Sequence, residues 1–545
     1  MDPYEQQKIN TKRYKKLKIL LKSVYSYDTF RAKQYEIINK VVSGEDVCAV
    51  LRTGFGKSIC YQLPAIYLDK PAIIVSPLIS LMDDQKMILE NLGISSCCYN
   101  SNIPNKSNLK KEILQGKYRF VYITPESVIQ MGEFLNKLEE IQGISLFAID
   151  EAHCISSYGF DFRKAYRELT FFKEKFPQIP ILAVTATATN LVARDICRVL
   201  GLKCDEPIKM SFDRPNLYIE VRRKSKNISQ DIIPIIDKYQ GQSIIIYCLT
   251  KKETDKIAEI LKLHNYNCGV YHAGINTDDK MEAHHNFIEG KIKIIVATIA
   301  FGMGINKSDV RVIIHYGSPK NIEGYYQEIG RAGRDGQESY CYTFYNFRDF
   351  KIQEHFINNS TNDIYQKTQL KMLNQMKMYI TTQQCRRKIL LEYFDEEHPG
   401  NCQFCDNCNG KHQIKEINVS TQQDVQKETK MLINLIESIK NRSFGISMYI
   451  NILRGSANKN ITSFLKKNEY YGKGKHRSVA WWKELIEHLV ELGYLQSVSL
   501  KGGSFPIQVI RVTRTGLSWT NMGELDEILG GNTANLLPIK MTTTV

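Results

Sequence analysis

The sequence predicts an α/β protein with two parallel-sheet lobes in tandem, followed by a helical region and a small domain of helices with a β-hairpin. In two successive segments of similar size, short apolar strands alternate with helical stretches, which is typical of parallel sheets. Polar motifs follow several strand ends. After about residue 346 the strands give way to helical periodicity, and four cysteines lie close together near residue 400.

The expected strands are short apolar runs, because parallel strands are covered by helices on both faces. In the first lobe these runs are residues 47–51, 72–78, 119–124, 145–150 and 181–187. In the second lobe they are residues 243–248, 268–273, 293–298 and 311–316. Two related lobes with polar strand ends predict a ligand site between them.

The C-terminal part has a different pattern. Helical periodicity is expected over 351–395, a polar linker over 410–423, and short helices followed by a hairpin over 424–519, whereas the last 25 or so residues have little pattern. These changes predict the domain boundaries 1–207, 208–346, 347–412 and 413–520, with a tail at 521–545.

The chain has 545 residues and a formal net charge of +15. This charge indicates a polyanionic partner, or else only a solubilising surface. No run approaches the roughly 18 apolar residues that a membrane span needs, and the N-terminus lacks the apolar core of a signal peptide. We therefore expect an intracellular protein with no membrane partner; protein partners are not predictable.

A phosphate-binding loop is expected directly after the first strand. Its residues are Thr53, Gly54, Phe55, Gly56, Lys57 and Ser58. Glycines let the backbone N–H groups turn toward phosphates at a helix N-terminus. Lys57 would meet the β and γ phosphates of ATP, and Ser58 would bind Mg²⁺. Leu51 and Phe55 both stand where such loops usually have glycine.

Two carboxylates follow the apolar strand 145–150. Asp150 would hold the Mg²⁺ that bridges the phosphates, and Glu151 would act as general base on the attacking water. Asp150-Glu151-Ala152-His153 alone is often only a charged strand end. Together with the phosphate loop, it predicts an ATPase.

Several long motifs resemble the two motor lobes of the RecQ family of DNA helicases. They are LRTGFGKSICYQLPA, VSPLISLMDDQ, YITPE, DEAHCISSYGFDFR, AVTATAT, SFDRPNL, YHAGI, VATIAFGMGINKSDVR and YYQEIGRAGRDG. The resemblance covers roughly residues 25–520. It implies two RecA-like lobes, a helical zinc-binding subdomain and an RQC winged helix, with no evident HRDC domain.

The resemblance also implies an activity. An ATP-dependent 3′→5′ DNA helicase would translocate on single-stranded DNA and unwind forked or tailed duplexes in DNA repair, recombination or replication. It would associate with chromosomes in the nucleus or cytoplasm. Its cofactors would be ATP, Mg²⁺ and one structural Zn²⁺.

Nucleotide contacts are implied from both lobes. Tyr27, Arg31 and Gln34 resemble the adenine pocket of the family, where the Gln amide pairs with the base. From the second lobe, Gln327, Arg331 and Arg334 would reach ATP. We assign the arginine-finger role to Arg334 first and to Arg331 second, because a guanidinium stabilises charge on the γ-phosphate.

Contacts to single-stranded DNA are implied by the aromatic loop and by strand ends. Tyr158 and Phe160 would stack on bases and Arg163 would contact phosphate, although Tyr158, Ser157 and Phe160 replace the usual Trp, Gln and His. Phe162 would be a base contact or simply core. The strand backbone would meet the motifs that contain Ser76, Thr124, His272 and Thr298.

Four cysteines form a C-x16-C-x2-C-x2-C pattern. Four thiolates at this spacing are typical of a closed tetrahedral zinc site, and the alternative is free reduced cysteines. The segment resembles the RecQ zinc segment, which implies Cys385, Cys402, Cys405 and Cys408 as ligands.

Residues 424–519 resemble the RQC domain, which binds duplex DNA. Lys473, Lys475, His476 and Arg477 would grip phosphates, or would only form a solvated basic face. At the hairpin tip, Phe505 would be a strand-separating wedge or a core residue. Because Trp481 and Trp482 are adjacent, at most one of them is expected to face the core.

Three alternatives remain open at this point. An RNA helicase shares the DEAH chemistry. A DNA-binding protein that has lost catalysis would keep the fold, although Lys57, Asp150 and Glu151 are intact. A translocase would remodel protein–DNA complexes without separating strands.

Overall fold

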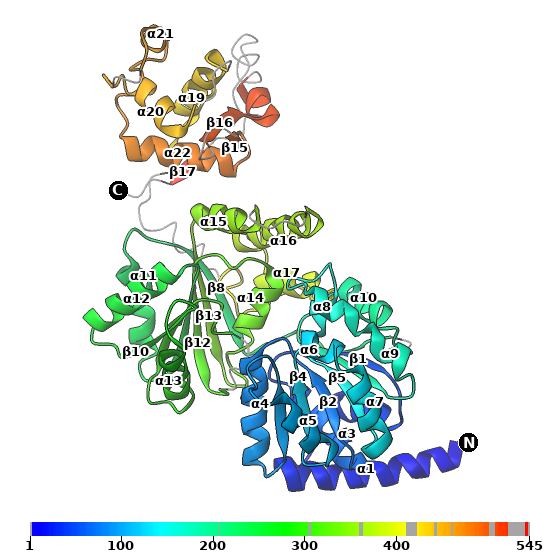
Figure 1. The fold of residues 1–545 in the computed structure, drawn as a ribbon. Helices are drawn as coiled ribbons and strands as arrows, with labels where there is room; N and C mark the ends of the chain where they lie inside the picture. The colour runs from blue at the N-terminus through cyan, green and yellow to red at the C-terminus, as the bar shows by residue number, and fades with distance from the viewer. Residues whose placement is uncertain are drawn as a thin grey trace. The chain divides into compact units, whose positions relative to one another are not determined.

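Two parallel sheets form the frame of the larger part of the chain (Figure 1). The computed structural model describes residues 3–204, 206–302, 307–358, 363–409, 422–440, 444–458, 461–500, 507–520 and 540–542. Contacts divide the chain into two units, Met1–Lys411 and His412–Val545, and each is described by itself.

The first sheet has seven strands in the order β3-β4-β2-β5-β6-β1-β7, and its neighbouring strands are parallel. The five strands that the sequence predicts are present and slightly shorter than expected: β1 (Val47–Val50), β2 (Ala72–Val75), β4 (Phe120–Ile123), β5 (Leu146–Ile149) and β6 (Ile181–Thr185). The sequence analysis missed β3 (Ser96–Tyr99) and β7 (Ile208–Lys209). Both are short and lie at the two edges of the sheet, where apolar patterning is weak.

Helices cover both faces of this sheet. Cys48 and Val50 of β1 belong to one apolar cluster, and Val47 and Ala49 belong to the other. The face with Val47 packs against α2 (Gln34–Val42), α3 (Lys57–Leu68) and α4 (Ile79–Asn91). The opposite face packs against α5 (Lys106–Leu114), α7 (Gly132–Gln142), α9 (Phe171–Lys175) and α10 (Asn190–Leu200). The remaining helices of this lobe are α1 (Pro3–Tyr25), α6 (Pro125–Ile129) and α8 (Lys164–Arg167), with 3₁₀ turns at Ala152–Ile155 and Glu168–Thr170.

The second sheet has six strands in the order β10-β11-β9-β12-β13-β8, again all parallel. The predicted strands are β9 (Ser243–Cys248), β10 (Cys268–Tyr271), β11 (Ile294–Ala297) and β12 (Val310–Tyr316). The strands β8 (Leu217–Arg223) and β13 (Ser339–Tyr345) were not predicted, because charged and hydroxyl side chains interrupt their apolar pattern. The helices are α11 (Ile228–Lys238), α12 (Lys251–Leu263), α13 (Thr277–Ile288) and α14 (Ile322–Ile329).

Three helices follow the second sheet, as expected for 351–395. They are α15 (Phe347–Asn358), α16 (Asp363–Thr381) and α17 (Arg386–Tyr393). Apolar residues of α16 and α17 belong to the same cluster as one face of the second sheet. Beyond α17, Cys405 forms a parallel bridge with Ile219 of β8, so the cysteine segment extends the edge of that sheet.

The second unit contains helices and a two-stranded antiparallel hairpin. Its helices are α19 (Gln426–Ser438), α20 (Ile446–Leu453), α21 (Ser463–Lys466) and α22 (Val479–Glu491), and the hairpin strands are β15 (Leu495–Leu500) and β16 (Ile507–Val512). Trp482 is fully buried in the core and Trp481 only partly, as the adjacency of the two residues requires. A short pair, β14 (Gln422–Asp424) with β17 (Lys540–Thr542), joins the ends of the unit. Most of the predicted linker and tail lies outside the described residues.

Candidate nucleotide, zinc and nucleic-acid sites

The phosphate loop connects β1 to α3. Gly54 and Gly56 have φ angles of 78° and 82°, which favour glycine. The ring of Phe55 has Arg31 5.6 Å and Arg52 5.3 Å from its centroid. These cation–π contacts hold the Phe55 ring between two arginines, an arrangement that the sequence pattern did not reveal.

The two DEAH carboxylates follow β5 beside this loop. The backbone N–H of Asp150 donates to the carbonyl of Val75 at 2.9 Å, which fixes the strand end. Glu151 has a left-handed φ of 49°. Its Oε1 lies 3.6 Å from Lys57 Nζ, and its Oε2 lies 3.3 Å from His153 Nδ1. The geometry therefore joins the loop lysine to the carboxylate predicted to act as base.

The two carboxylates have opposite pKa shifts. Burial and the neighbouring charge of Glu151 raise the pKa of Asp150 to about 6. Burial also opposes ionisation of Glu151, but Lys57 and His153 prevail and lower its pKa to about 2. Lys57 and His153 therefore favour the charged form of Glu151, whereas burial beside Glu151 favours the neutral form of Asp150. Loss of the Lys57 charge would raise the pKa of Glu151.

The second lobe adds polar side chains at the same place. Asn321 begins α14 by accepting a bond from the N–H of Gly324 at 2.8 Å. From this helix, Gln327 Nε2 lies 3.5 Å from Glu151 Oε1. Arg331 and Arg334 follow α14, and a β-carbon added at Gly54 would lie 2.9 Å from Arg334 Cγ. The structure thus brings Gln327 to the DEAH motif and Arg334 to the phosphate loop.

Positive charge is concentrated where the lobes meet. Burial, with Arg331 and Arg214 nearby, lowers the pKa of Arg334 to about 9. Such a cluster of guanidiniums would be stabilised by a polyanion. The sequence analysis assigned no role to Arg214, although this residue lies in the motif SFDRPNL.

Two of the three predicted adenine contacts, Arg31 and Gln34, bond to the phosphate loop. Gln34 is only 2% exposed, and its Nε2 donates to the carbonyls of Phe55 at 3.1 Å and Gly56 at 3.3 Å. Its Oε1 accepts from the backbone N–H of Arg31, and Arg31 NH1 donates to the Gly54 carbonyl at 2.7 Å. Tyr27 is exposed. Adenine would therefore have to replace bonds that Gln34 makes in this structure.

The four cysteines predicted as metal ligands lie together. The Sγ atoms of Cys385, Cys402, Cys405 and Cys408 lie within 4.8 Å of one another, and Cys402 and Cys408 are 3.8 Å apart. A tetrahedral site with Zn–S bonds of about 2.3 Å requires S–S separations of about 3.8 Å. A hydrogen bond from Cys402 lowers the pKa of Cys405 to about 5, which favours the thiolate. The cluster fits zinc, with no open position for catalysis.

The aromatic loop is joined to the DEAH motif. Phe160 stacks on His153, with ring centroids 4.5 Å apart. Tyr158 is 47% exposed, whereas Phe162 is half-buried. Arg163 NH1 donates to the Pro77 carbonyl at 2.8 Å, and its NH2 lies 3.3 Å from Asp161. Tyr158 is thus the most accessible of the residues predicted to stack on bases.

The strand-end residues differ in accessibility. Ser76 is buried at the end of β2, and Thr124 Oγ1 donates to Ser127 at 2.8 Å. His272 is buried; its Nε2 lies 2.9 Å from Asp255, and its Nδ1 accepts from the N–H of Gly274. Thr298, half-buried after β11, donates its backbone N–H to Tyr271. Both ring nitrogens of His272 are therefore engaged within the lobe.

Part of the basic cluster in the second unit is exposed, and part is paired with Glu428. Lys473 and Lys475 are exposed. Arg477 pairs with Glu428 at 2.8 Å and lies 4.3 Å from the centroid of a Trp481 ring, and His476 Nε2 lies 3.3 Å from Glu428. The predicted wedge, Phe505, lies outside the described residues.

Four family descriptions match the chain in order. They are DEAD/DEAH box helicase at residues 31–195, helicase conserved C-terminal domain at 226–336, RecQ zinc-binding at 347–409 and RQC domain at 420–524. The ATP-dependent DNA helicase RecQ of Bacillus subtilis is 37% identical and covers 89% of this chain and 81% of its own length. The chain belongs to the RecQ family. It is therefore an ATP-dependent helicase, with ATP, Mg²⁺ and zinc as its cofactors.

Other relatives of this RecQ-family chain differ in name and length. A protein of Acanthamoeba polyphaga mimivirus named as ATP-dependent RNA helicase R290 is 65% identical over the full length of both chains. The bifunctional 3′-5′ exonuclease/ATP-dependent helicase WRN of Mus musculus is 37% identical over 92% of this chain, which spans only 36% of the mouse protein.

Solved structures support the fold. The DUF1998 helicase MrfA, bound to DNA and AMPPNP, aligns with a TM-score of 0.51 at 19% identity, over 73% of this RecQ-family chain and 60% of its own. This confirms the prediction of two RecA-like lobes. Among the described helices, none is both long and apolar enough to cross a lipid bilayer.

Proposed function

We propose that this RecQ-family chain is a DNA helicase that moves 3′→5′ on single-stranded DNA and unwinds forked or tailed duplexes. It would act on chromosomes, in the nucleus or cytoplasm, during repair, recombination or replication. The observation that supports the two-lobe motor in this proposal is that Gln327 Nε2 of the second lobe lies 3.5 Å from Glu151 Oε1 of the first.

The positions of the nucleotide-site residues support a specific role for each. Lys57 would bind the β and γ phosphates, and Ser58 and Asp150 would hold Mg²⁺, which neutralises phosphate oxygens. Glu151 would accept the proton of the attacking water. Arg334, or failing it Arg331, would stabilise the charge that develops on the γ-phosphate.

Relative motion of the lobes would follow from this arrangement. While ATP is present, its phosphates attract the arginines of the second lobe toward the loop of the first. After cleavage and phosphate release this attraction is weaker, so the lobes would separate. Each cycle would shift one lobe along the strand that both contact. The stack of Phe160 on His153 offers a path by which a bound base at Tyr158 would influence Glu151.

DNA is favoured over RNA by the modules that follow the motor. The zinc-binding and RQC segments match over residues 347–409 and 420–524, and the Bacillus subtilis relative, similar over most of the chain, is named a DNA helicase. A second candidate is an RNA helicase, because the mimivirus relative at 65% identity is named as one.

A substrate panel tests both candidates. ATP hydrolysis is measured with no nucleic acid, with single-stranded DNA and with single-stranded RNA of the same sequence. Strand displacement is measured on 3′-tailed DNA, 5′-tailed DNA and a 3′-tailed RNA duplex. The proposal expects stimulation by DNA and displacement of the 3′-tailed DNA alone.

Lys57→Ala provides the control for the motor itself. It should abolish hydrolysis and displacement together. Faster displacement of the RNA duplex would favour the second candidate. Displacement of the 5′-tailed DNA duplex would indicate movement in the opposite direction, 5′→3′. DNA-stimulated hydrolysis without displacement on any substrate would indicate a translocase. A Lys57→Ala protein that separates duplexes at the parent rate would end the proposal.

A further inference from the structure

Arg387, on the zinc-segment helix α17, is bound to the chain between the two sheets. Its NH2 donates to the carbonyls of Arg214 at 3.3 Å, Pro215 at 3.1 Å and Leu217 at 3.3 Å. Its Nε lies 3.4 Å from Asp213 Oδ1. Because the guanidinium is planar and almost completely buried, these bonds fix residues 213–217 firmly against α17.

Arg214 extends in turn to the loop after α14. Its NH2 donates to the carbonyls of Ala332 at 2.7 Å and Gly333 at 2.9 Å, and its NH1 lies 3.4 Å from the Gly330 carbonyl. These carbonyls flank Arg331 and immediately precede Arg334. All three bonds are to backbone, so Arg214 holds the main chain of the loop, together with Asn216, whose Nδ2 also donates to the Gly333 carbonyl at 3.0 Å.

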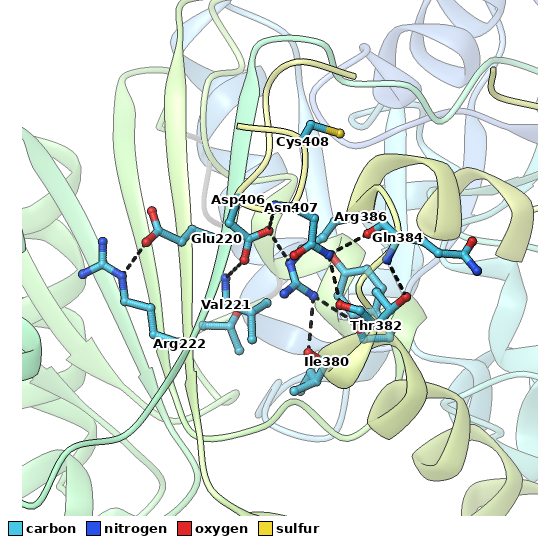
Figure 2. Close-up of polar contacts among 12 residues, drawn as sticks. Glu220, Val221, Arg222, Ile380, Thr382, Gln384, Arg386, Asp406, Asn407 and Cys408 are labelled. Atoms are coloured by element: carbon cyan, nitrogen blue, oxygen red, sulfur yellow. Dashed lines mark hydrogen bonds and ion pairs between the residues drawn. The ribbon is translucent and has the colours of Figure 1, made fainter. Parts of the chain in front are cut away.

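The zinc segment holds α17 in place (Figure 2). Arg386 Nε donates to Asp406 Oδ1 at 2.6 Å, and these side chains are 2% and 1% exposed. Asp406 Oδ2 accepts from the N–H of Val221 in β8 at 2.8 Å, and the Asp406 N–H donates to the Ile219 carbonyl. Since Cys405 and Cys408 flank Asp406, the cysteine cluster would fix this carboxylate between α17 and the edge of the second sheet.

The end of α17 also contacts α14 itself. Tyr393 OH donates to Glu323 Oε1 at 2.5 Å, and the Phe394 ring stacks on Phe212 with centroids 4.1 Å apart. Tyr326 of α14 donates to the Phe212 carbonyl at 2.6 Å. The helix that carries Gln327 is therefore supported from the zinc segment at its start and middle.

We propose that Arg387 and Arg214 are positioning residues for ATP hydrolysis: together they transmit the position of the zinc segment to the Gly330–Gly333 loop and so set Arg331 and Arg334 at the phosphate loop. In this role neither residue would need to contact the nucleotide. The inference rests on the proposed function, because it takes Arg334 as the residue that stabilises the transition state.

This role predicts a specific kinetic pattern. Loss of Arg387 would leave Lys57, Asp150 and Glu151 unmoved, since they belong to the first lobe. ATP would still bind, but the arginines would no longer be held where charge develops. The effect would therefore fall on kcat and leave KM for ATP nearly unchanged.

The experiment uses the full-length zinc-loaded protein. Arg387→Ala and Arg214→Ala are compared with Arg387→Lys and with Lys388→Ala, a change at the neighbouring position of α17 whose side chain pairs only with Glu392 among the described ion pairs. Three quantities are measured: kcat and KM with single-stranded DNA, affinity for ADP with and without aluminium fluoride, and zinc per chain.

We expect Arg387→Ala to lower kcat at least tenfold, with KM for ATP changed less than twofold. Affinity for ADP should be kept, whereas the gain in affinity that aluminium fluoride gives the parent should be lost. Arg387→Lys, which keeps one donor, should recover part of both, and Lys388→Ala should match the parent. All variants should retain one zinc.

Other outcomes overturn the inference in distinguishable ways. Parental kcat in both Arg387→Ala and Arg214→Ala, with Arg334→Ala inactive, rejects the positioning role but leaves the motor intact. Equal loss of ADP and ADP–aluminium fluoride affinity, or loss of zinc in Arg387→Lys as well, indicates general unfolding and also rejects it. A parent protein without DNA-stimulated hydrolysis would instead reject the proposed function.

Discussion

Arg334 of the second lobe packs against Gly54 of the phosphate loop so closely that a β-carbon at Gly54 would lie 2.9 Å from Arg334 Cγ. The glycine therefore serves two purposes. It adopts a φ of 78°, and it leaves room for a side chain from the other lobe. The contact makes the position of Arg334 sensitive to both lobes.

We expect Arg334→Ala to leave ATP affinity within about threefold and to lower turnover by about 10³-fold or more, the range seen for arginine fingers. The reason is that the guanidinium would act on charge that develops only in the transition state. DNA-stimulated hydrolysis and binding of a fluorescent ATP analogue check this. Arg194→Ala, an exposed arginine on α10, is the matched control. Unchanged hydrolysis in Arg334→Ala would refute the assignment.

The cysteine cluster predicts one zinc per chain. Cys405→Ser should lower the zinc content to near zero and reduce thermal stability, because zinc ligation supplies a large part of the folding free energy of such segments, about 10–16 kcal/mol in small modules. Metal analysis and thermal unfolding measure both effects. Cys204→Ser, a half-buried cysteine outside the cluster, should change neither. A folded parent protein without metal would contradict the prediction.

The exposed ring of Tyr158 predicts a base contact. Tyr158→Ala should weaken binding of single-stranded DNA about tenfold, which corresponds to about 1.4 kcal/mol and lies within the range for one stacked base. Hydrolysis without DNA should be unchanged, because Tyr158 is exposed and belongs to neither the phosphate loop nor the DEAH motif. Fluorescence anisotropy with labelled DNA measures the affinity, and Tyr14→Ala on α1 is the control. Equal DNA affinities of Tyr158→Ala and the parent would show that Tyr158 does not contact single-stranded DNA.

Asp84 of α4 predicts a pH-dependent stability. Burial, followed by the charge of Asp83, raises its pKa to about 6, so the folded protein binds this proton more tightly than the unfolded chain, where the pKa is about 3.9. The contribution of Asp84 to stability is full below pH 4 and is lost as the pH rises through about 6. Asp84→Asn removes that loss. Because the side chain is partly exposed, we expect a gain in unfolding free energy of about 1 kcal/mol at pH 8 and none at pH 4.

Urea unfolding at the two pH values measures this difference. Glu140→Gln, at an exposed position of α7, should change stability equally little at both. If Asp84→Asn were no more stable than the parent at pH 8, the raised pKa of Asp84 would be wrong.

The motor frame was predictable because its strands are continuous apolar runs. In β9 the predicted and observed residues are identical, Ser243–Cys248. Edge strands such as β3, with the sequence SCCY, carry no such run and were missed. The helix α1 was also missed, because only Leu17 and Leu21 mark its buried face among many lysines.

The functional site likewise combines residues that local sequence identifies with contacts that it does not. Lys57 and Glu151 lie in local motifs whose spacing and residue types are enough to indicate their chemistry, and the fold brings their charged atoms within 3.6 Å of each other. Gln34 was predicted as an adenine contact, yet its amide is used by the phosphate loop. Its partners are backbone groups, which every sequence has and no motif identifies.

By itself the sequence determined the two-lobe α/β fold, the family, the phosphate loop with its DEAH partner, and the four-cysteine cluster, because each depends on residues close together in the chain or on apolar periodicity. Only the tertiary structure decided that Phe55 lies between two arginines, that His272 is internal, and that Arg387 reaches Arg214 and, through it, the loop of Arg334. The contacts of Arg387 join segments about 170 residues apart through backbone atoms. Such long-range bonds depend on how the lobes and the zinc segment pack, which local sequence does not encode.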